Sequence, residues 1–276
     1  MCTLVARTYL FVPGNRPERF KKALASEADA VVLDLEDAVA VDDKSSARES
    51  VGTQLAGMSA EARRRVVVRI NDIASSWFVI DLRMLLRSGG ARVMLPKAES
   101  AAQIASVRGA LPDADVLALI ETARGVVAVD EIAAAPGVSR LVYGTIDFAL
   151  DLDLDTASGD EGLAYAAGRI AVASRAAGLA APVAGVTPQF DDEVRLLSDL
   201  QQARRFGFGA KLCIHPKQID AVHRALRPSP AAVEWALRVL KAEAASPGAA
   251  KLDGRMVDRP IVLQAERTLL RSDHRR

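Results

Sequence analysis

Eight short apolar segments recur along the chain, and longer helix-like segments separate them. Continuous apolar runs of this length indicate strands that are buried on both faces, as in a parallel sheet. Eight strand–helix units in a chain of 276 residues favour a closed barrel over an open doubly wound sheet. We therefore expect an α/β fold of the (β/α)₈ TIM-barrel type. The predicted strands centre on or end near Tyr9, Leu33, Ile70, Met94, Glu121, Val142, Ala184 and Cys213.

A further stretch of chain follows the eighth strand and its helix. Residues 228–245 predict another helix, and an amphipathic helix follows the Asp258-Arg259-Pro260 segment. A barrel does not need these elements. We therefore expect a barrel domain of residues 1–226 and a C-terminal helical arm or lid of residues 227–276 that packs on a neighbouring subunit. The helices predicted within the barrel span residues 17–25, 42–55, 99–111, 124–135, 161–177, 191–206 and 217–226.

The charges of the chain are balanced, with 36 Lys and Arg against 35 Asp and Glu and a net charge of +1. This neutrality gives no electrostatic reason to expect binding to nucleic acid or to a membrane surface. No apolar stretch is long enough for a membrane span, and the first one is too short for a signal segment. Cys2 and Cys213 are far apart, which argues against a disulfide scaffold or zinc knuckle. We expect a cytoplasmic enzyme.

Charged residues stand at several predicted strand ends, where the catalytic face of such a barrel lies. Glu121 and Asp147 follow successive strands, so both carboxylates can converge on one oxygen-loving cation. Two carboxylates without a nearby His or Cys suit Mg²⁺, with Mn²⁺ as a substitute, better than zinc. The alternative is structural, in which Glu121 pairs with Arg124 and Asp147 caps a turn. Spacing alone leaves both interpretations open.

Arg69 ends an apolar strand, a costly place for a cation unless an anion meets it. Its guanidinium group suits two-point binding of a substrate carboxylate, while the alternative is a salt bridge to Glu36 or Asp37. Asp34 and Glu36 stand two apart on a strand and therefore point to the same side. We expect these two acids, together with Asp37, to orient an arginine or a metal-bound water rather than to act on substrate directly.

Other signals at the strand ends are weaker. The Pro13-Gly14-Asn15-Arg16 turn suits a phosphate group or is a plain turn, and His215 supports the mouth or touches substrate. Lys97 and Lys211 are the only candidates for a lysine that forms a Schiff base, and neither is an obvious one. Nucleophile-elbow, phosphate-loop and zinc-protease motifs do not occur in the sequence.

Eight motifs occur in order along nearly the whole chain: LFVPGNRPERFKKA, VVLDLEDAV, VVVRIN, VMLPKAES, ALIETARG, YGTIDFAL, CIHPKQI and DGRMVDRP. Together they resemble the citrate lyase β-subunit-like family of CoA-ester lyases, which is related to the HpcH/HpaI aldolases. The resemblance implies a (β/α)₈ barrel with a C-terminal arm, assembled as trimers or hexamers. It implies that Glu121 and Asp147 bind Mg²⁺, that Arg69 holds a carboxylate, and that Asp258 is an acid/base residue from a neighbouring subunit's arm. It also places the CoA phosphates near Arg16.

The reaction implied by the resemblance is cleavage or formation of a carbon–carbon bond in a 3-hydroxyacyl-CoA such as malyl- or citramalyl-CoA. A 2-oxo acid and an acetyl-CoA-type product result, and Asp258 exchanges a proton with the enolate carbon. Two positions depart from the family pattern, because Ile146 and Ala184 stand where many members carry acids. The alternatives are an aldolase that acts on free 2-oxo acids without CoA, and a non-catalytic protein that binds an acyl-CoA or a dicarboxylate.

Overall fold

The computed structural model describes residues 5–156, 159, 161–246, 248 and 251–272. The chain divides into two compact units, one formed by residues 5–222 and one that begins at residue 223. Cys2 lies outside the described residues, as do the last four residues of the predicted arm.

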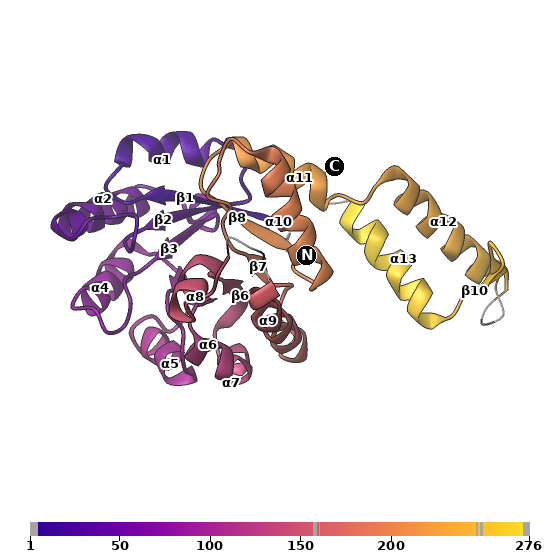
Figure 1. Ribbon diagram of the computed structural model, residues 1–276. Helices are drawn as coiled ribbons and strands as arrows, with labels where there is room; N and C mark the ends of the chain where they lie inside the picture. The colour runs from indigo at the N-terminus through magenta and orange to yellow at the C-terminus, as the bar shows by residue number, and fades with distance from the viewer. Residues whose placement is uncertain (1–4, 157–158, 160, 247, 249–250, 273–276) are drawn as a thin grey trace. The chain divides into compact units, whose positions relative to one another are not determined.

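The first unit is a closed barrel in which each strand pairs with the next and the eighth pairs with the first. All eight pairings are parallel, and the ring closes where Tyr9 stands opposite Leu212. This arrangement confirms the predicted (β/α)₈ fold (Figure 1). The strands are β1 (Thr8–Pro13), β2 (Ala30–Asp34), β3 (Val66–Arg69), β4 (Arg92–Leu95), β5 (Asp115–Ile120), β6 (Val138–Tyr143), β7 (Val183–Ala184) and β8 (Ala210–Cys213).

Helices connect the strands and lie outside them, as Figure 1 shows. The sequence prediction named no helix between the third and fourth strands, yet α4 occupies this connection. Its buried face carries Phe78, Leu82 and Leu85, while Val79 and Leu86 are exposed. The helices of this part are α1 (Pro17–Leu24), α2 (Lys44–Ala56), α3 (Ala60–Arg63), α4 (Phe78–Ser88), α5 (Ala101–Ala110), α6 (Ala123–Val127), α7 (Val129–Ala134), α8 (Thr145–Asp151), α9 (Ala164–Ala176), α10 (Glu193–Arg205) and α11 (Lys217–Leu226), with 3₁₀ turns η1 (Val41–Asp43) and η2 (Glu161–Leu163).

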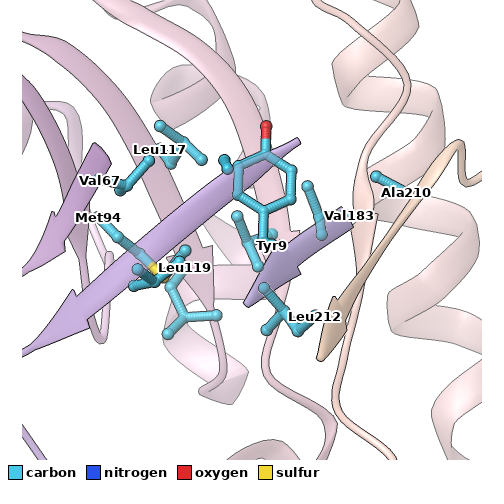
Figure 2. Close-up of a cluster of buried hydrophobic side chains, with 11 residues drawn as sticks. Tyr9, Val67, Met94, Leu117, Leu119, Val183, Ala210 and Leu212 are labelled. Atoms are coloured by element: carbon cyan, nitrogen blue, oxygen red, sulfur yellow. The ribbon is translucent and has the colours of Figure 1, made fainter. Parts of the chain in front are cut away.

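The interior of the barrel is filled by side chains from alternate strand positions. Figure 2 shows Tyr9, Val67, Leu117, Leu119 and Leu212 gathered in this cluster. Because side chains of a strand alternate between its two faces, the next inward positions lie at the carboxyl ends of the strands. The positions of these apolar residues therefore determine which polar residues point into the open carboxyl end of the barrel, its mouth.

The second unit is a small helical assembly with its own apolar core. Its two helices are α12 (Pro230–Ala245) and α13 (Arg259–Ser272), and between them lies a hairpin of β9 (Lys251–Leu252) and β10 (Arg255–Met256). Ala236, Val239, Val257, Val262 and Ala265 form its buried cluster. Over the described residues, no helix of the protein has the length and apolar character needed to cross a bilayer.

Candidate active site

Charged side chains from several strand ends meet at the carboxyl end of the barrel. Asp34 ends β2 and Arg69 ends β3, at positions in register with the inward-facing Val32 and Val67. Glu121 directly follows β5 and continues the inward row of Leu117 and Leu119. The alternation of side chains along each strand therefore brings two acids, Asp34 and Glu121, and one cation, Arg69, to the carboxyl end of the barrel.

Arg69 is held by acids of the neighbouring strand. Its Nε and Nη2 donate to the two oxygens of Asp34 at 2.7 and 2.6 Å. Its Nη1 lies 2.7 Å from Glu36 Oε2, an ion pair without hydrogen-bond geometry. The guanidinium carbon also lies 5.0 Å from the centre of the Phe11 ring. The salt-bridge interpretation of Arg69 therefore holds for Glu36, and Asp34 is the acid that positions it most directly.

Asp34 is a fully satisfied acid, whereas Asp37 is peripheral. Besides Arg69, the Asp34 carboxylate accepts the backbone N–H groups of Glu36 and Ala38 at 3.0 and 3.1 Å. The Asp37 side chain is 60% exposed, and its oxygen lies 3.9 Å from Arg69 Nη1. The three acids expected to support the site thus divide into two buried members and one at the rim.

Lys97 links two acids of the mouth. Its backbone N–H donates to Glu121 Oε1 at 2.8 Å, and its ammonium donates to Glu36 Oε1 at 2.8 Å. Burial alone would lower the pKa of Lys97, but the hydrogen bond to Glu36 and the negative charges of Glu36, Glu121 and Asp37 together outweigh it and raise that pKa. Lys97 is therefore a protonated cation here and not a ready Schiff-base nucleophile.

Glu121 is a buried acid whose ionised form is unfavourable when no cation is bound. Its residue is 2% exposed, and burial, followed by repulsion from Asp147, raises the pKa of its carboxyl to about 8. Gly144 leaves room for it, because a Cβ atom there would lie 2.5 Å from Glu121 Oε2. A divalent cation between Glu121 and Asp147 would relieve both the burial and the repulsion, so the residues present fit an oxygen-liganded metal.

Asp147 lies in the first turn of α8 and is half-buried. Within the described part of the chain it makes no hydrogen bond or ion pair, and Arg124 lies 3.7 Å from Glu99 rather than pairing with Glu121. Neither structural alternative considered for these two acids is realised. Among the described residues, no group of three or more His, Cys, Asp or Glu side chains is placed to hold a metal ion.

Lys44 is a supporting residue that the sequence analysis missed. It is buried, and its ammonium donates to the carbonyl oxygens of Leu35 and Glu36 and to Asn71 Oδ1 at 2.7, 2.8 and 2.7 Å. Asn71 in turn donates to Asp81. In the sequence, Lys44 resembles any exposed lysine of an amphipathic helix, so no local signal distinguishes it.

Three further predicted residues, Arg16, His215 and Asp258, have other partners. Arg16 is half-exposed and donates to Glu18 at 2.6 Å, on the turn after β1. His215 packs on Phe190 with 5.0 Å between ring centres, consistent with the supporting interpretation. Asp258 belongs to the second unit, where it is exposed and its Oδ1 accepts the N–H of Ile261 at the start of α13.

Comparison with known proteins shows a family match and full-length relatives. Residues 7–216 match the family described as HpcH/HpaI aldolase/citrate lyase. A (3S)-malyl-CoA thioesterase of Cereibacter sphaeroides is 34% identical, over 97% of this chain and 94% of that protein. A citrate lyase subunit beta-like protein of Mycobacterium tuberculosis is 39% identical, over 96% and 94%.

Solved structures show the same relationship. The M. tuberculosis protein CitE in complex with magnesium, acetoacetate and coenzyme A superposes with a TM-score of 0.87 at 37% identity, covering 97% of this chain and 98% of that one. The citrate lyase beta subunit of the same organism, complexed with oxaloacetate and magnesium, gives a TM-score of 0.73 at 37% identity, over 83% and 100%.

Proposed function

The chain belongs to the HpcH/HpaI aldolase/citrate lyase family, and we propose that it is a magnesium-dependent carbon–carbon lyase acting on the CoA thioester of a small 3-hydroxy acid. The products are a 2-oxo acid and an acetyl-CoA-type thioester, or the reverse in the condensing direction. It acts on small molecules in the cytoplasm, not on nucleic acid or membranes.

The observation that carries this proposal is the placement of Glu121. A buried carboxylate beside Asp147, with its pKa raised to about 8, is an unfavourable arrangement that a divalent cation would stabilise. The related CitE structures hold magnesium together with acetoacetate, pyruvate or oxaloacetate. When bound by Glu121 and Asp147, Mg²⁺ would supply a Lewis acid and a template for the carboxylate and adjacent oxygen of the 2-oxo acid.

The other mouth residues orient the reactant. Asp34 accepts two of the five N–H groups of Arg69, which leaves donors on the terminal nitrogens for a substrate carboxylate. Asp34 and Glu36 fix the plane of that guanidinium before substrate arrives, so little ordering remains to be done on binding. Lys97 adds a second positive charge beside Glu36. Arg16, on the turn after β1, contacts the CoA phosphates.

The C-terminal arm, residues 227–276, completes the site in a homotrimer or hexamer. Each arm packs on a neighbouring subunit and brings Asp258 to that subunit's barrel mouth. The Asp258 side chain is exposed and accepts one N–H at the start of α13. During cleavage the 3-hydroxyl group loses its proton as the carbon–carbon bond breaks, and Asp258 in its carboxylic acid form donates a proton to the enolate carbon; during condensation the Asp258 carboxylate removes a proton from that carbon.

Thioester hydrolysis is the second candidate, because relatives at 34% identity over nearly the whole chain are (3S)-malyl-CoA thioesterases. Hydrolysis breaks the bond between the acyl carbon and sulfur and releases free CoA thiol. Cleavage of the carbon–carbon bond leaves the thioester intact in the product. The two reactions are therefore separated by counting thiols.

The test is a panel of malyl-, methylmalyl- and citramalyl-CoA incubated with the protein and Mg²⁺, with and without EDTA. Phenylhydrazine traps released glyoxylate or pyruvate, and a thiol reagent measures free CoA. EDTA-sensitive hydrazone without thiol supports the lyase, whereas thiol without hydrazone favours the thioesterase. Cleavage of only free 4-hydroxy-2-oxo acids would replace the proposal with the CoA-independent aldolase, and no turnover of any of these compounds would favour the non-catalytic binder.

A further inference from the structure

A pocket lies outside the barrel wall and is lined by residues of strands β6–β8 and of helices α8, α9 and α10. Its volume is about 360 Å³, which is within the range of small-molecule sites. None of the mouth residues Asp34, Arg69, Lys97 or Glu121 lines it. Asp147 does not line the pocket either, but its chain neighbours Thr145 and Ile146 do, so the pocket borders the candidate active site without sharing its charged residues.

Lys211 of β8 is the buried charge of this pocket. Its neighbours Ala210 and Leu212 face the barrel interior, so Lys211 points outward towards the helices. The residue is 2% exposed. Its ammonium donates to the carbonyl oxygen of Gly185, and no carboxylate of the described residues lies within ion-pair distance. Two of its three N–H groups are thus available to a ligand.

The rest of the pocket lining consists of one ion pair and of apolar side chains. Arg195 and Asp199 also line the pocket, but they bind each other at 2.6 Å, and Asp199 accepts the hydroxyl of Thr187. The pair adds no net charge, so the pocket holds the single positive charge of Lys211. Burial lowers the pKa of Lys211 to about 8, and the more distant charge of Asp199 offsets this only in part. The apolar lining includes Leu163, Ala167, Ala203, Phe206 and Phe208.

We propose that this pocket binds a small aliphatic monocarboxylate, with the carboxylate on Lys211 and the hydrocarbon chain against the apolar wall. One negative charge matches the one uncompensated positive charge. The apolar lining favours a short alkyl chain over a second polar group. Ile146 and Ala184, the two positions that depart from the family pattern, both line this pocket rather than the acid cluster of the mouth.

The probe is hexanoate, titrated calorimetrically into the full-length protein in EDTA, with hexanamide as the uncharged analogue. We expect saturable binding of hexanoate and affinity at least about tenfold weaker for hexanamide. Lys211→Met should weaken hexanoate binding by about tenfold or more. The matched control Lys217→Met, which removes an exposed lysine paired with Asp191, should leave it unchanged.

A second variant tests the pocket without touching the lysine. Ala203→Phe should fill the apolar part and abolish hexanoate binding while Lys211 is retained. Circular dichroism establishes that each variant is folded. Equal hexanoate affinity in the wild type and in Lys211→Met or Ala203→Phe would overturn the proposal, as would the absence of saturable binding to the wild type up to the order of 10 mM.

Discussion

Asp34 and Arg69 stand opposite each other on neighbouring strands and join through two hydrogen bonds of 2.7 and 2.6 Å. Asp34 is fully buried, and the Arg69 side chain is 11% exposed. The pair therefore fixes the orientation of a guanidinium at the mouth of the barrel before any ligand is bound. Because both groups are buried, removal of either charge would leave the other without a partner and would destabilise the folded protein.

Replacement of Asp34 tests this dependence. Asp34→Asn keeps the shape of the side chain but removes the charge that compensates Arg69, and we expect the free energy of unfolding to fall by about 3–5 kcal/mol. Urea denaturation measures the loss. Asp37→Asn is the control, because that acid is exposed and lies 3.9 Å from Arg69; it should cost less than about 0.5 kcal/mol. Equal losses in the two variants would contradict a specific role for Asp34.

Gly144 is predicted to keep Glu121 in place. In Gly144→Ala, the new Cβ would lie 2.5 Å from Glu121 Oε2 and 2.6 Å from Glu121 Cβ, so the acid must move. We expect the affinity for Mn²⁺, measured by electron paramagnetic resonance, to fall at least about tenfold. Gly168→Ala is the control, since nothing lies within 4 Å of its Cβ. It should keep metal affinity, and wild-type affinity in both variants would refute the prediction.

The barrel and the residues at its strand ends were predictable because their signals are local. Uninterrupted apolar runs mark buried parallel strands, and a charge such as Arg69 at the end of one needs a partner. The alternation of strand side chains then puts Asp34 and Glu36 on one side, and both contact Arg69. These inferences use only neighbours in sequence and the regular geometry of a strand.

Residues that act through long-range contacts were not predictable in this way. Lys44 is on a helix, and its role depends on carbonyl groups after β2 and an amide after β3. Lys97 was considered as a nucleophile, but its bond to Glu36, 61 positions away in sequence, makes it a stable cation.

The raised pKa of Glu121 predicts a pH dependence of stability. The folded, metal-free protein holds this proton up to about pH 8, whereas the unfolded chain releases it near 4.5. Between these values the folded state binds more protons, so the contribution of Glu121 to stability falls as pH rises, by up to about 1.4 kcal/mol per pH unit. Urea denaturation in EDTA from pH 5 to 8 should show this component in the wild type and lose it in Glu121→Gln. Identical pH profiles would contradict the assignment.

Subunit mixing tests whether the arm acts across an interface. Asp258→Asn and Glu121→Ala should each be inactive alone. After exchange of subunits in equal amounts, random assembly places an intact Glu121 beside a neighbour's intact Asp258 in about a quarter of the sites. Lyase activity should then return to about that fraction of the wild type. Continued inactivity despite exchange shown by mass spectrometry would rule out a shared site.

The most direct test of the central claim is the stoichiometry of Mn²⁺ binding, followed by electron paramagnetic resonance with pyruvate present. The wild type should bind one ion per chain, and Glu121→Gln and Asp147→Asn should each weaken binding at least about tenfold. Glu99→Gln, which changes a nearby acid paired with Arg124, should bind as the wild type does. Undiminished Mn²⁺ binding in both the Glu121 and Asp147 variants would contradict the account.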